Sequence, residues 1–439
     1  MANTKVVHIP SDARSWPTQR EWMHLEDLCE GVFDCPHSTP IITKTGPYVV
    51  RSQDMRSGVF RADEAARVSE QTYAERIVRA EPRYGDILYS REGTYFGIAA
   101  DVPKDIKLCL GQRMVLIRPK KDRLHPRFLR LWLNSRTLSR HIRGFRDGTV
   151  AERLNMPTIR SLPVPRFDFT EQESIVSLIG PLDDKIELNR QMSETLEESA
   201  RSLFKDWFID FGPTRAKISG ASRYLSPNTW ALFPDVFDDV GIPAPWSKTK
   251  LGTEFDLTMG QSPPGDTYNE AGQGLPFFQG RTDFGFRYPI RRVFCSAPTR
   301  TAEPDDTLVS VRAPVGDLNM AWERCCIGRG VAAVRHKSGS RSFTYYAIAS
   351  TQQALRAYEH TGTVFGAINK QQFAMLDVIS PSTMMIAAFE DSVAPFDARI
   401  RANTSENETL SQLRNMLLPG LISGQLRLKD AARQIKEGL

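Results

Sequence analysis

The amino-acid sequence predicts an α+β protein in which two mixed α/β domains are separated by two long antiparallel coiled-coil helices, as a pseudo-two-fold internal repeat. The first observation behind this prediction is a segment that occurs twice, since residues 181–189 return in changed form at 395–403. The second is an apolar heptad pattern that runs through both copies of the segment. A repeat period of about half the chain favours two copies of one unit over a solenoid of short repeats.

The repeat extends beyond the helices into the globular parts. Each half of the chain is therefore expected to contain one globular domain followed by one long helix. Short apolar runs between Gly and Pro residues predict strands at 87–89, 114–117 and 331–334, whereas 128–133 is typical of a helix. The segments that align, first copy before second, are 148–150 with 362–364, Asn155 with Asn369, 109–113 with 326–330, and 85–90 with 305–310.

Two heptad patterns locate the long helices. Apolar residues recur every seven positions through 175–203, and again through 389–417. Each pattern is broken once by a polar residue, Asn189 in the first and Asn403 in the second. A buried Asn in such a seam lowers stability but fixes register, so we expect Asn189 and Asn403 to pair or face each other. The alternative is that both lie hydrated at the edge of the seam.

Local signals set the ends of these helices. The S/T-x-x-E pattern at 170–173 predicts a capping box that starts the first helix. We expect that helix to end at Gly212-Pro213 and the second at Pro419-Gly420. Near its end the first helix carries an aromatic stripe at helical spacing, which predicts packing, or docking of a partner protein if it is exposed. The docking candidates in this stripe are Phe204, Trp207 and Phe208.

Charge is segregated along the chain. Residues 110–146 hold eleven Lys or Arg against one acid, whereas 171–210 hold four bases against ten acids. A basic stretch of that density is typical of a phosphate-binding surface, although a solvated face is the alternative. About thirty helical residues span roughly 45 Å, which exceeds one turn of B-DNA at about 34 to 36 Å. Two DNA-reading domains held by such helices could therefore enter successive major grooves.

The composition argues against several other classes of protein. A chain of 439 residues, 41% of them hydrophobic, has enough apolar side chains for several folded domains. No run of 18 apolar residues or signal peptide is present, so we expect a cytoplasmic protein without contact to a membrane. The six cysteines have no Cys-x-x-Cys spacing and are expected to be buried thiols.

The sequence also lacks phosphate-binding loops, dinucleotide-binding turns and zinc-binding helix motifs. Residues 34–39 combine Asp, Cys, His and hydroxyl groups, which favours a DNA-contacting loop over an activated nucleophile because the second copy carries no equivalent group. The acidic pairs 183–184 and 305–306 are expected to be solvated acids and not a metal site.

Several segments resemble one family, the specificity subunits of type I restriction-modification systems. The resemblance covers essentially the whole chain and is most specific in the helices. Residues 180–190, 195–197 and 203–208 are similar to the central conserved helix of that family, and 413–424 are similar to the end of its distal helix. Trp246, Leu251-Gly252 and 260–263 resemble the opening of its second recognition domain.

This resemblance implies a non-catalytic subunit that directs a DNA adenine methyltransferase and an ATP-dependent restriction endonuclease in phage defence. Each of two target recognition domains would read one half of a bipartite, asymmetric site in double-stranded DNA, and the helices would set the spacing. Two methyltransferase subunits, which bind S-adenosylmethionine, and two restriction subunits, which use ATP and Mg, would be the partners; this chain itself would hold no cofactor. The implied boundaries are 1–166 for target recognition domain 1, 167–211 for the central helix, 212–380 for target recognition domain 2, and 381–439 for the distal helix and tail.

The resemblance does not carry over the residues that touch DNA, so candidates were chosen as polar or Arg positions beside Gly or Pro in the repeated loops. Arg can bind guanine with two hydrogen bonds and Gln can bind adenine, each with about 1 to 3 kcal/mol of discrimination. Each could instead contact phosphate or form a surface ion pair. The candidates are Ser38, Thr39, Arg91, Arg113 and Arg146 in the first domain, and Gln279, Arg281, Arg312 and Arg329 in the second.

Two other functions are alternatives for this sequence. A stand-alone DNA methyltransferase or nuclease with a diverged site would consume S-adenosylmethionine or cut DNA without partners. A coiled-coil scaffold would explain the heptads but not the basic stretch, and it would show no DNA affinity at any salt concentration. Several phosphate contacts instead predict an affinity that falls steeply as salt rises.

Overall fold

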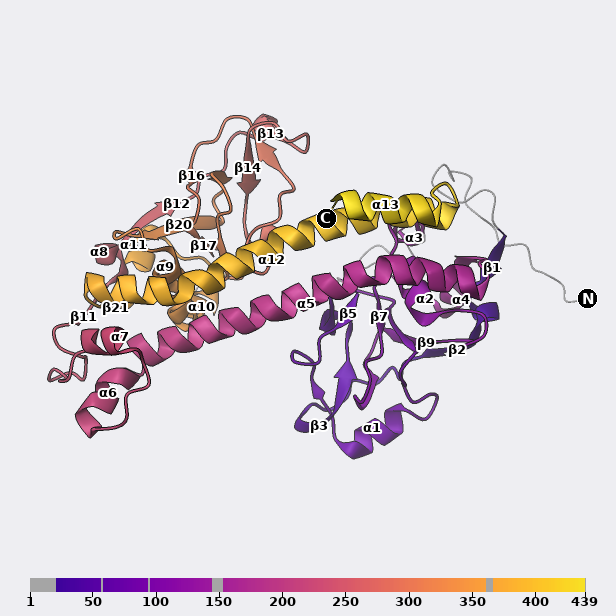
Figure 1. Cartoon of the computed structure of the whole chain (residues 1–439), viewed down its shortest axis with the longest axis horizontal. Helices are drawn as coiled ribbons and strands as arrows, with labels where there is room; N and C mark the ends of the chain where they lie inside the picture. The colour runs from indigo at the N-terminus through magenta and orange to yellow at the C-terminus, as the bar shows by residue number, and fades with distance from the viewer. Residues whose placement is uncertain (1–20, 57, 94, 144–152, 361–365, 439) are drawn as a thin grey trace, which may run out of the picture. The chain divides into compact units, whose positions relative to one another are not determined.

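The computed structural model describes residues 21–56, 58–93, 95–143, 153–360 and 366–438 (Figure 1). Contacts divide the chain into two compact units, which are described separately. Unit 1 comprises residues 1–188 and 406–439, and unit 2 comprises 189–405. The division falls within both long helices, α5 (Phe169–Phe208) and α12 (Thr383–Ser423), so each helix contributes residues to both units. The predicted domain boundaries stay a prediction.

Unit 1 is built on a four-stranded antiparallel sheet of order β2-β9-β6-β7, with β2 (Cys29–Asp34), β9 (Met114–Pro119), β6 (Ile87–Ser90) and β7 (Ala99–Asp101). The central strands are buried on both faces, which explains their near-continuous apolar sequence. The other elements of unit 1 are β1 (Trp22–His24), β3 (Thr43–Val50), β4 (Met55–Arg56), β5 (Val59–Phe60), α1 (Glu70–Arg76), β8 (Leu108–Leu110), α2 (Pro126–Leu133), α3 (Arg136–Ile142), α4 (Met156–Arg160), β10 (Pro163–Pro165) and α13 (Leu428–Gly438).

Unit 2 repeats this sheet as β12-β20-β17-β18, again antiparallel throughout, with β12 (Phe255–Met259), β20 (Val331–His336), β17 (Thr307–Ser310) and β18 (Leu318–Met320). Its other elements are α6 (Gly212–Ser219), α7 (Pro227–Leu232), β11 (Ser247–Lys250), α8 (Leu251–Glu254), β13 (Tyr268–Asn269), β14 (Leu275–Phe278), β15 (Phe294–Cys295), β16 (Thr301–Ala302), β19 (Cys325–Ile327), α9 (Arg341–Ser350), α10 (Gln352–Arg356), α11 (Lys370–Ala374) and β21 (Asp377–Ser380). The predicted mixture of helices and strands is confirmed in both units.

Other pairings also occur twice, so the internal repeat holds at the level of topology. The parallel pair β3-β8 corresponds to β14-β19, and the antiparallel pair β1-β10 to β11-β21. The aligned residues Asn155 and Asn369 are both helix N-caps. Each side chain accepts a hydrogen bond from a backbone N–H of the short helix that it caps, α4 for Asn155 and α11 for Asn369. The repeat in the sequence therefore preserves helix caps as well as apolar residues.

The first long helix begins with a different capping box from the expected one. Asp168 Oδ1 accepts a 2.7 Å hydrogen bond from Glu171 N, and Glu171 Oε2 accepts one of 3.2 Å from Asp168 N. The predicted box at Thr170 and Glu173 is wrong because the helix starts at Phe169, which places Asp168 at the cap. An Asp with Glu three residues later satisfies the same physical rule as Thr with Glu.

The predicted ends of the long helices are also corrected. Helix α5 ends at Phe208, before Gly212-Pro213, and α12 continues through Pro419 and Gly420 to Ser423. Proline removes one backbone hydrogen bond from a helix, but burial of apolar side chains on the same turns outweighs that loss here. These buried side chains are Leu417, Leu418, Leu421 and Ile422.

Within each unit, the segments of α5 and α12 run antiparallel. In unit 1, Arg414 Nη1 donates to Asp183 Oδ1 at 2.8 Å, and Asn407 Nδ2 donates to Ile186 O at 3.3 Å, so later residues of α12 meet earlier residues of α5. Each of these two pairs lies on facing helix surfaces. A continuous coiled coil along the whole length stays a prediction.

The two seam asparagines meet in unit 2. Asn189 and Asn403 are both buried, and Asn403 Nδ2 donates to Asn189 O at 3.2 Å and to Ser193 Oγ at 3.1 Å. They face each other as expected, and a hydrated position at the edge is excluded. Their role in fixing the helix register stays a prediction.

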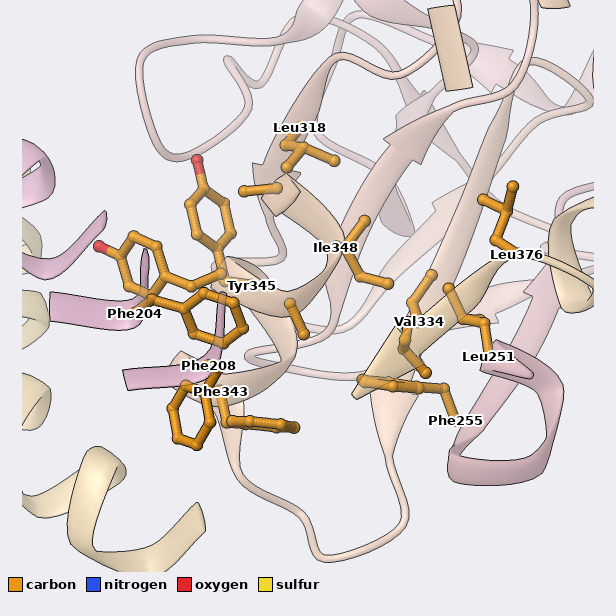
Figure 2. Packing of buried hydrophobic residues seen from close by; sticks show 14 of the residues in the cluster. Phe204, Phe208, Leu251, Phe255, Leu318, Val334, Phe343, Tyr345, Ile348 and Leu376 are labelled. Carbon is orange, nitrogen blue, oxygen red and sulfur yellow. The ribbon is translucent and has the colours of Figure 1, made fainter. Parts of the chain in front are cut away.

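The aromatic stripe of α5 lies in the core of unit 2 (Figure 2). Phe208 packs on Phe343 of α9 with ring centroids 5.4 Å apart, and Trp207 packs on Phe389 of α12 at 5.8 Å. Phe204 lies within the same cluster and is also buried. The proposed docking role of Phe204, Trp207 and Phe208 is therefore wrong, because these side chains are buried in the core and are not available to a partner protein.

The described residues include no group of acids, histidines and cysteines able to hold a metal ion. All six cysteines are buried, as expected, and none of them forms a disulfide. None of the described helices combines the length and the apolar character that crossing a bilayer requires.

The buried His336 at the end of β20 predicts how the stability of unit 2 depends on pH. Burial lowers the pKa of His336 from its ordinary 6.5, and this effect exceeds the opposite influence of Glu254. A folded-state pKa below that of the unfolded chain gives stability that is present above about pH 6.5 and is lost as pH falls through the folded value. His336 Nδ1 accepts a hydrogen bond from Ser338 N at 3.0 Å, which Asn can imitate with its own carbonyl oxygen.

We therefore expect His336→Asn to lose less thermal stability than the unmodified protein between about pH 7.5 and pH 5.5, whatever its starting melting temperature. The measurement is the melting temperature of both proteins across that range. Parallel curves would show that His336 does not contribute to the pH dependence.

Candidate nucleic-acid interface

Four loops meet at one end of the main sheet in unit 2. They comprise residues 260–262, 279–283, 311–317 and 328–330. Backbone hydrogen bonds join each loop to a neighbour, so their relative positions are fixed by main chain and not by flexible side chains. These bonds are Gln261 N to Ile327 O at 3.0 Å, Gly328 N to Phe278 O at 2.9 Å, and Val311 N to Gly330 O at 2.9 Å.

The contact between two of these loops requires a glycine. A Cβ atom added to Gly330 would lie 2.3 Å from the backbone oxygen of Gln279, far inside the van der Waals limit. A side chain at this position would therefore push the loop that carries Gln279 away from the loop that carries Arg329. The glycine is a requirement for bringing two of the predicted DNA-contacting residues side by side.

All four candidates of the second half are exposed on these loops. Gln279 and Arg281 lie on one loop, and Arg312 and Arg329 lie on the two loops that flank the Val311–Gly330 hydrogen bond. The Arg281 side chain is 60% exposed and forms an ion pair with Asp317, which connects the 279–283 loop to the 311–317 loop. The structure thus gathers three guanidinium groups and one amide into one set of loops.

In unit 1, the loop at 34–39 is held in place by a buried arginine of α1. Arg76 donates to the backbone oxygens of Leu110 at 2.8 Å, Ser38 at 3.0 Å and Pro36 at 3.2 Å. Ser38 and Thr39 remain exposed on this loop. The Ser38 hydroxyl also accepts a hydrogen bond of 3.3 Å from Arg76 Nη1, so the loop presents the Thr39 side chain from a backbone that Arg76 holds in place.

Arg91 is the one described candidate that the structure removes from the surface. It is only 4% exposed, and its guanidinium lies 3.2 Å from Asp34 Oδ1. A base contact would require this ion pair to break, so we no longer propose one for Arg91. The residue instead joins two loops, because Arg91 N donates to Arg113 O at 3.0 Å.

Arg113 is exposed and forms an ion pair of 3.3 Å with Glu92. Its backbone is left-handed, with φ at 67°, a conformation that costs free energy for any residue with a Cβ atom. Such strain is common in functional loops, so it agrees with a contact role for Arg113. Arg146, the last candidate of the first half, lies outside the described residues.

The geometry disfavours nucleophilic chemistry at residues 34–39. Cys35 is fully buried, and burial raises the pKa of its thiol above the ordinary value, which keeps it protonated. His37 Nε2 lies 3.4 Å from Asp34 Oδ2, but the His37 side chain is 65% exposed whereas Cys35 is buried. An activated cysteine instead needs an environment that lowers the pKa of its thiol.

Two of the acids expected to be solvated instead form ion pairs, Asp306 as a buried residue and Asp183 with a side chain that is only 10% exposed. Asp183 lies 2.8 Å from Arg414 and 3.2 Å from Arg130, and Asp306 lies 2.6 Å from Arg335. The prediction fails for Asp183 and Asp306 because pairing with arginine offsets the cost of burying a carboxylate. Asp184, in contrast, is exposed, as expected.

Sequence reasoning missed two kinds of residue near these loops. The anchoring Arg76 gives no signal in the sequence, because a single Arg in a short helix is ordinary. Ile41 and Ile42, which follow Thr39, are exposed at 79% and 51%. A pair of aliphatic residues in a loop of Pro, Ser and Thr could have been noticed as a surface feature.

Comparison with known proteins adds three findings. Residues 43–198 match the family described as the type I restriction modification DNA specificity domain. The chain is 27% identical to a protein of Methanocaldococcus jannaschii provisionally named as the type I restriction enzyme MjaX specificity subunit, over 97% of this chain and 96% of that protein. It is 25% identical to the type I restriction enzyme HindI specificity subunit of Haemophilus influenzae, over 78% of this chain and 86% of that protein.

One solved structure supports the fold. The crystal structure of a type I restriction-modification system S subunit from M. genitalium has a TM-score of 0.50 to this chain at 16% identity. The alignment covers 92% of this chain and 97% of that one.

The close approach at Gly330 leads to a matched pair of substitutions. We expect Gly330→Ala to separate the loops that carry Gln279 and Arg329, to speed amide exchange at Gly328, and to lower DNA affinity at least about tenfold. Gly280→Ala is the control, since its φ of 176° suits any residue and no atom lies within 4 Å of the added Cβ. Hydrogen exchange and a binding titration check both variants. Equal effects of the two would contradict the role assigned to Gly330.

Proposed function

We propose that this chain, which belongs to the specificity subunits of type I restriction-modification systems, reads a bipartite and asymmetric DNA site, one half with each unit. The observation that carries the proposal is that one scaffold occurs twice with different residues at the equivalent loop positions. In each unit the residue that follows β6 or β17 hydrogen-bonds to the turn before β9 or β20, as Arg91 N to Arg113 O in unit 1 and Val311 N to Gly330 O in unit 2.

The next residue on this scaffold differs in charge. It is Glu92 in unit 1 and Arg312 in unit 2, whereas the facing turns carry Arg113 and Arg329. A carboxylate accepts hydrogen bonds, for example from cytosine N4, whereas a guanidinium donates them, most often to guanine. Equivalent loops with opposite hydrogen-bonding character favour two different half-sites, and hence an asymmetric target.

The exposed groups suit DNA better than a scaffold role. Arg281, Arg312 and Arg329 can each reach a phosphate or a guanine edge, and Gln279 can form two hydrogen bonds with adenine. Contacts to phosphate would fix the position of the unit, and contacts to base edges would select the sequence. An assembly protein without a DNA role has no use for this set of donors on loops that the backbone holds together.

We further propose that α5 and α12 set the spacing between the two half-sites. Helices of 40 and 41 residues are each about 60 Å long at 1.5 Å per residue. This length is enough to span more than one turn of B-DNA, so the base pairs between the half-sites would remain unread.

The proposed complex contains partners that supply all of the chemistry. Two methyltransferase subunits would bind S-adenosylmethionine and dock on the conserved helices, and two restriction subunits would use ATP and Mg to cleave. Because Phe204, Trp207 and Phe208 are buried, the docking surface would lie on the outward faces of the helices. The chain itself would act by placing these subunits on the correct sequence.

Substitution of one exposed arginine tests the reading role. With the methyltransferase partner present, we expect Arg281→Gln to reduce discrimination at a single position of one half-site by about 5- to 150-fold, as loss of one bidentate contact implies. The measurement is the methylation rate on DNA duplexes in which each target position is changed in turn.

Arg324→Gln is the control for this experiment. Arg324 is equally exposed at 60% in unit 2 and forms an ion pair of 3.2 Å with Glu303, but it lies outside the four loops. It should leave discrimination unchanged. A uniform fall in rate on every duplex with Arg281→Gln would assign Arg281 to phosphate contact, and no fall would remove it from the interface.

A further inference from the structure

Arg287 lies in the same segment as the exposed Arg281 but has the opposite environment. Its side chain is 1% exposed, which makes it one of the largest fully buried side chains among the described residues. It belongs to the segment between Asp283 and β15, six residues after Arg281. A buried arginine this close to a proposed reading residue needs an explanation, because burial of a guanidinium is costly without partners.

The partners of Arg287 come from three helices. Its Nη1 lies 3.1 Å from Asp397 Oδ1 of α12, its Nε donates to Glu197 Oε2 of α5 at 3.3 Å, and its Nη2 donates to the Tyr346 hydroxyl of α9 at 2.7 Å. The guanidinium also lies over the Tyr345 ring, 3.9 Å from its centroid. One side chain thus connects the segment to both long helices and to the helix that covers the sheet.

The segment that carries Arg287 is held together by its own hydrogen bonds and by bonds to β18. Its backbone closes on itself through Ile290 N to Asp283 O at 2.7 Å, and Arg287 O accepts from Met320 N at 2.8 Å. The Asn319 side chain bonds both the N–H and the carbonyl of Gly285, at 3.1 and 3.0 Å. A shift of Arg287 would therefore be transmitted to the turn that carries Arg281.

The equivalent acid in unit 1 is engaged differently. The internal repeat pairs Asp397 with Asp183, whose partners are Arg130 of α2 and Arg414 of α12. Neither of these arginines lies in a loop that carries a candidate reading residue. The connection from a reading loop to the long helices through a buried arginine is thus a property of the second copy.

We propose that Arg287 is a positioning residue for the second half-site, which fixes the loop bearing Gln279 and Arg281 relative to α5 and α12. This inference rests on the proposed DNA-reading function. Arg287 contacts no DNA; it determines where the reading groups stand on the helices that set the spacing. Its planar fork meets two carboxylates and a hydroxyl together, which a lysine ammonium cannot reproduce.

Loss of Arg287 alone would not separate positioning from folding, since it would leave Asp397 buried without its ion-pair partner, while Glu197 would keep its ion pair of 3.0 Å with Arg201. Two variants avoid this problem. The triple variant Arg287→Met with Asp397→Asn and Glu197→Gln removes all three charges together, and Arg287→Lys keeps one positive charge without the fork. Melting temperature reports the fold of each variant, and position-resolved methylation rates with the methyltransferase partner report reading.

We expect both variants to melt within a few degrees of the unmodified protein and to lose at least about tenfold discrimination at the second half-site, with the first half-site unchanged. The control is Arg335→Met, which leaves Asp306 of the same unit buried without its ion-pair partner. Arg335 lies four residues after Val331, the end of β20 that adjoins the four loops. This variant should lower the melting temperature but keep discrimination in the folded protein.

Each outcome bears on the proposal. Normal reading of the second half-site by either folded variant would overturn the positioning role, as would an equal loss of discrimination in Arg335→Met. If the triple variant does not fold, the result with Arg287→Lys decides alone. Absence of a split target for the unmodified protein would instead contradict the proposed function, so the two failures are distinguishable.

Discussion

The burial of one face of each long helix in the globular cores is the constraint on which the rest of the structure depends. In unit 2, Trp207 and Phe208 of α5 pack with Phe343 of α9 and Phe389 of α12, so helix and sheet share one core. In unit 1, Ile175, Ile179 and Leu182 of α5 lie in the same cluster as Phe128 and Trp132 of α2. Because burial of such side chains supplies most of the driving force for folding, the loops of each unit cannot shift on its helices without loss of the core.

Polar contacts add direction to this apolar packing. The Asn403 amide contacts the Asn189 backbone within a buried seam, and Arg287 and Arg130 each reach an aspartate at the same repeat position of α12 or α5. Buried polar groups must meet their partners in a definite geometry. They therefore do more to prevent the helices from sliding along their neighbours than to raise the stability of the fold. The same helices therefore form part of both cores and carry the loops that hold the candidate DNA-contacting residues.

The sequence predicted the features that depend on periodicity and repetition. The heptads located both helices, the repeat implied two related globular domains of mixed α/β structure, and the Asn residues of the seam were expected to pair or face each other. Features that depend on tertiary contacts could not be predicted from the sequence. Arg91 and Arg281 occupy similar positions in the sequence, each in a predicted loop, but Arg91 is buried and its guanidinium lies 3.2 Å from Asp34. The stripe at Phe204, Trp207 and Phe208 fits a core or a docking surface equally well until its neighbours are known. The predicted helix ends were wrong in two places. Apolar packing outweighed the helix-breaking effect of Pro419 in α12, and Asp168 caps α5 in place of Thr170.

The central claim is that each half of the chain reads its own half of a DNA target, and a domain exchange tests it most directly. Residues 1–166 would be replaced by the matching segment of a specificity subunit with a different target, the chimera would be expressed with the methyltransferase partner, and methylated adenines would be mapped across the genome by single-molecule sequencing. The account predicts a split motif in which one half changes while the other half and the spacing stay the same. Change in both halves, or methylation that does not depend on this chain, would contradict it.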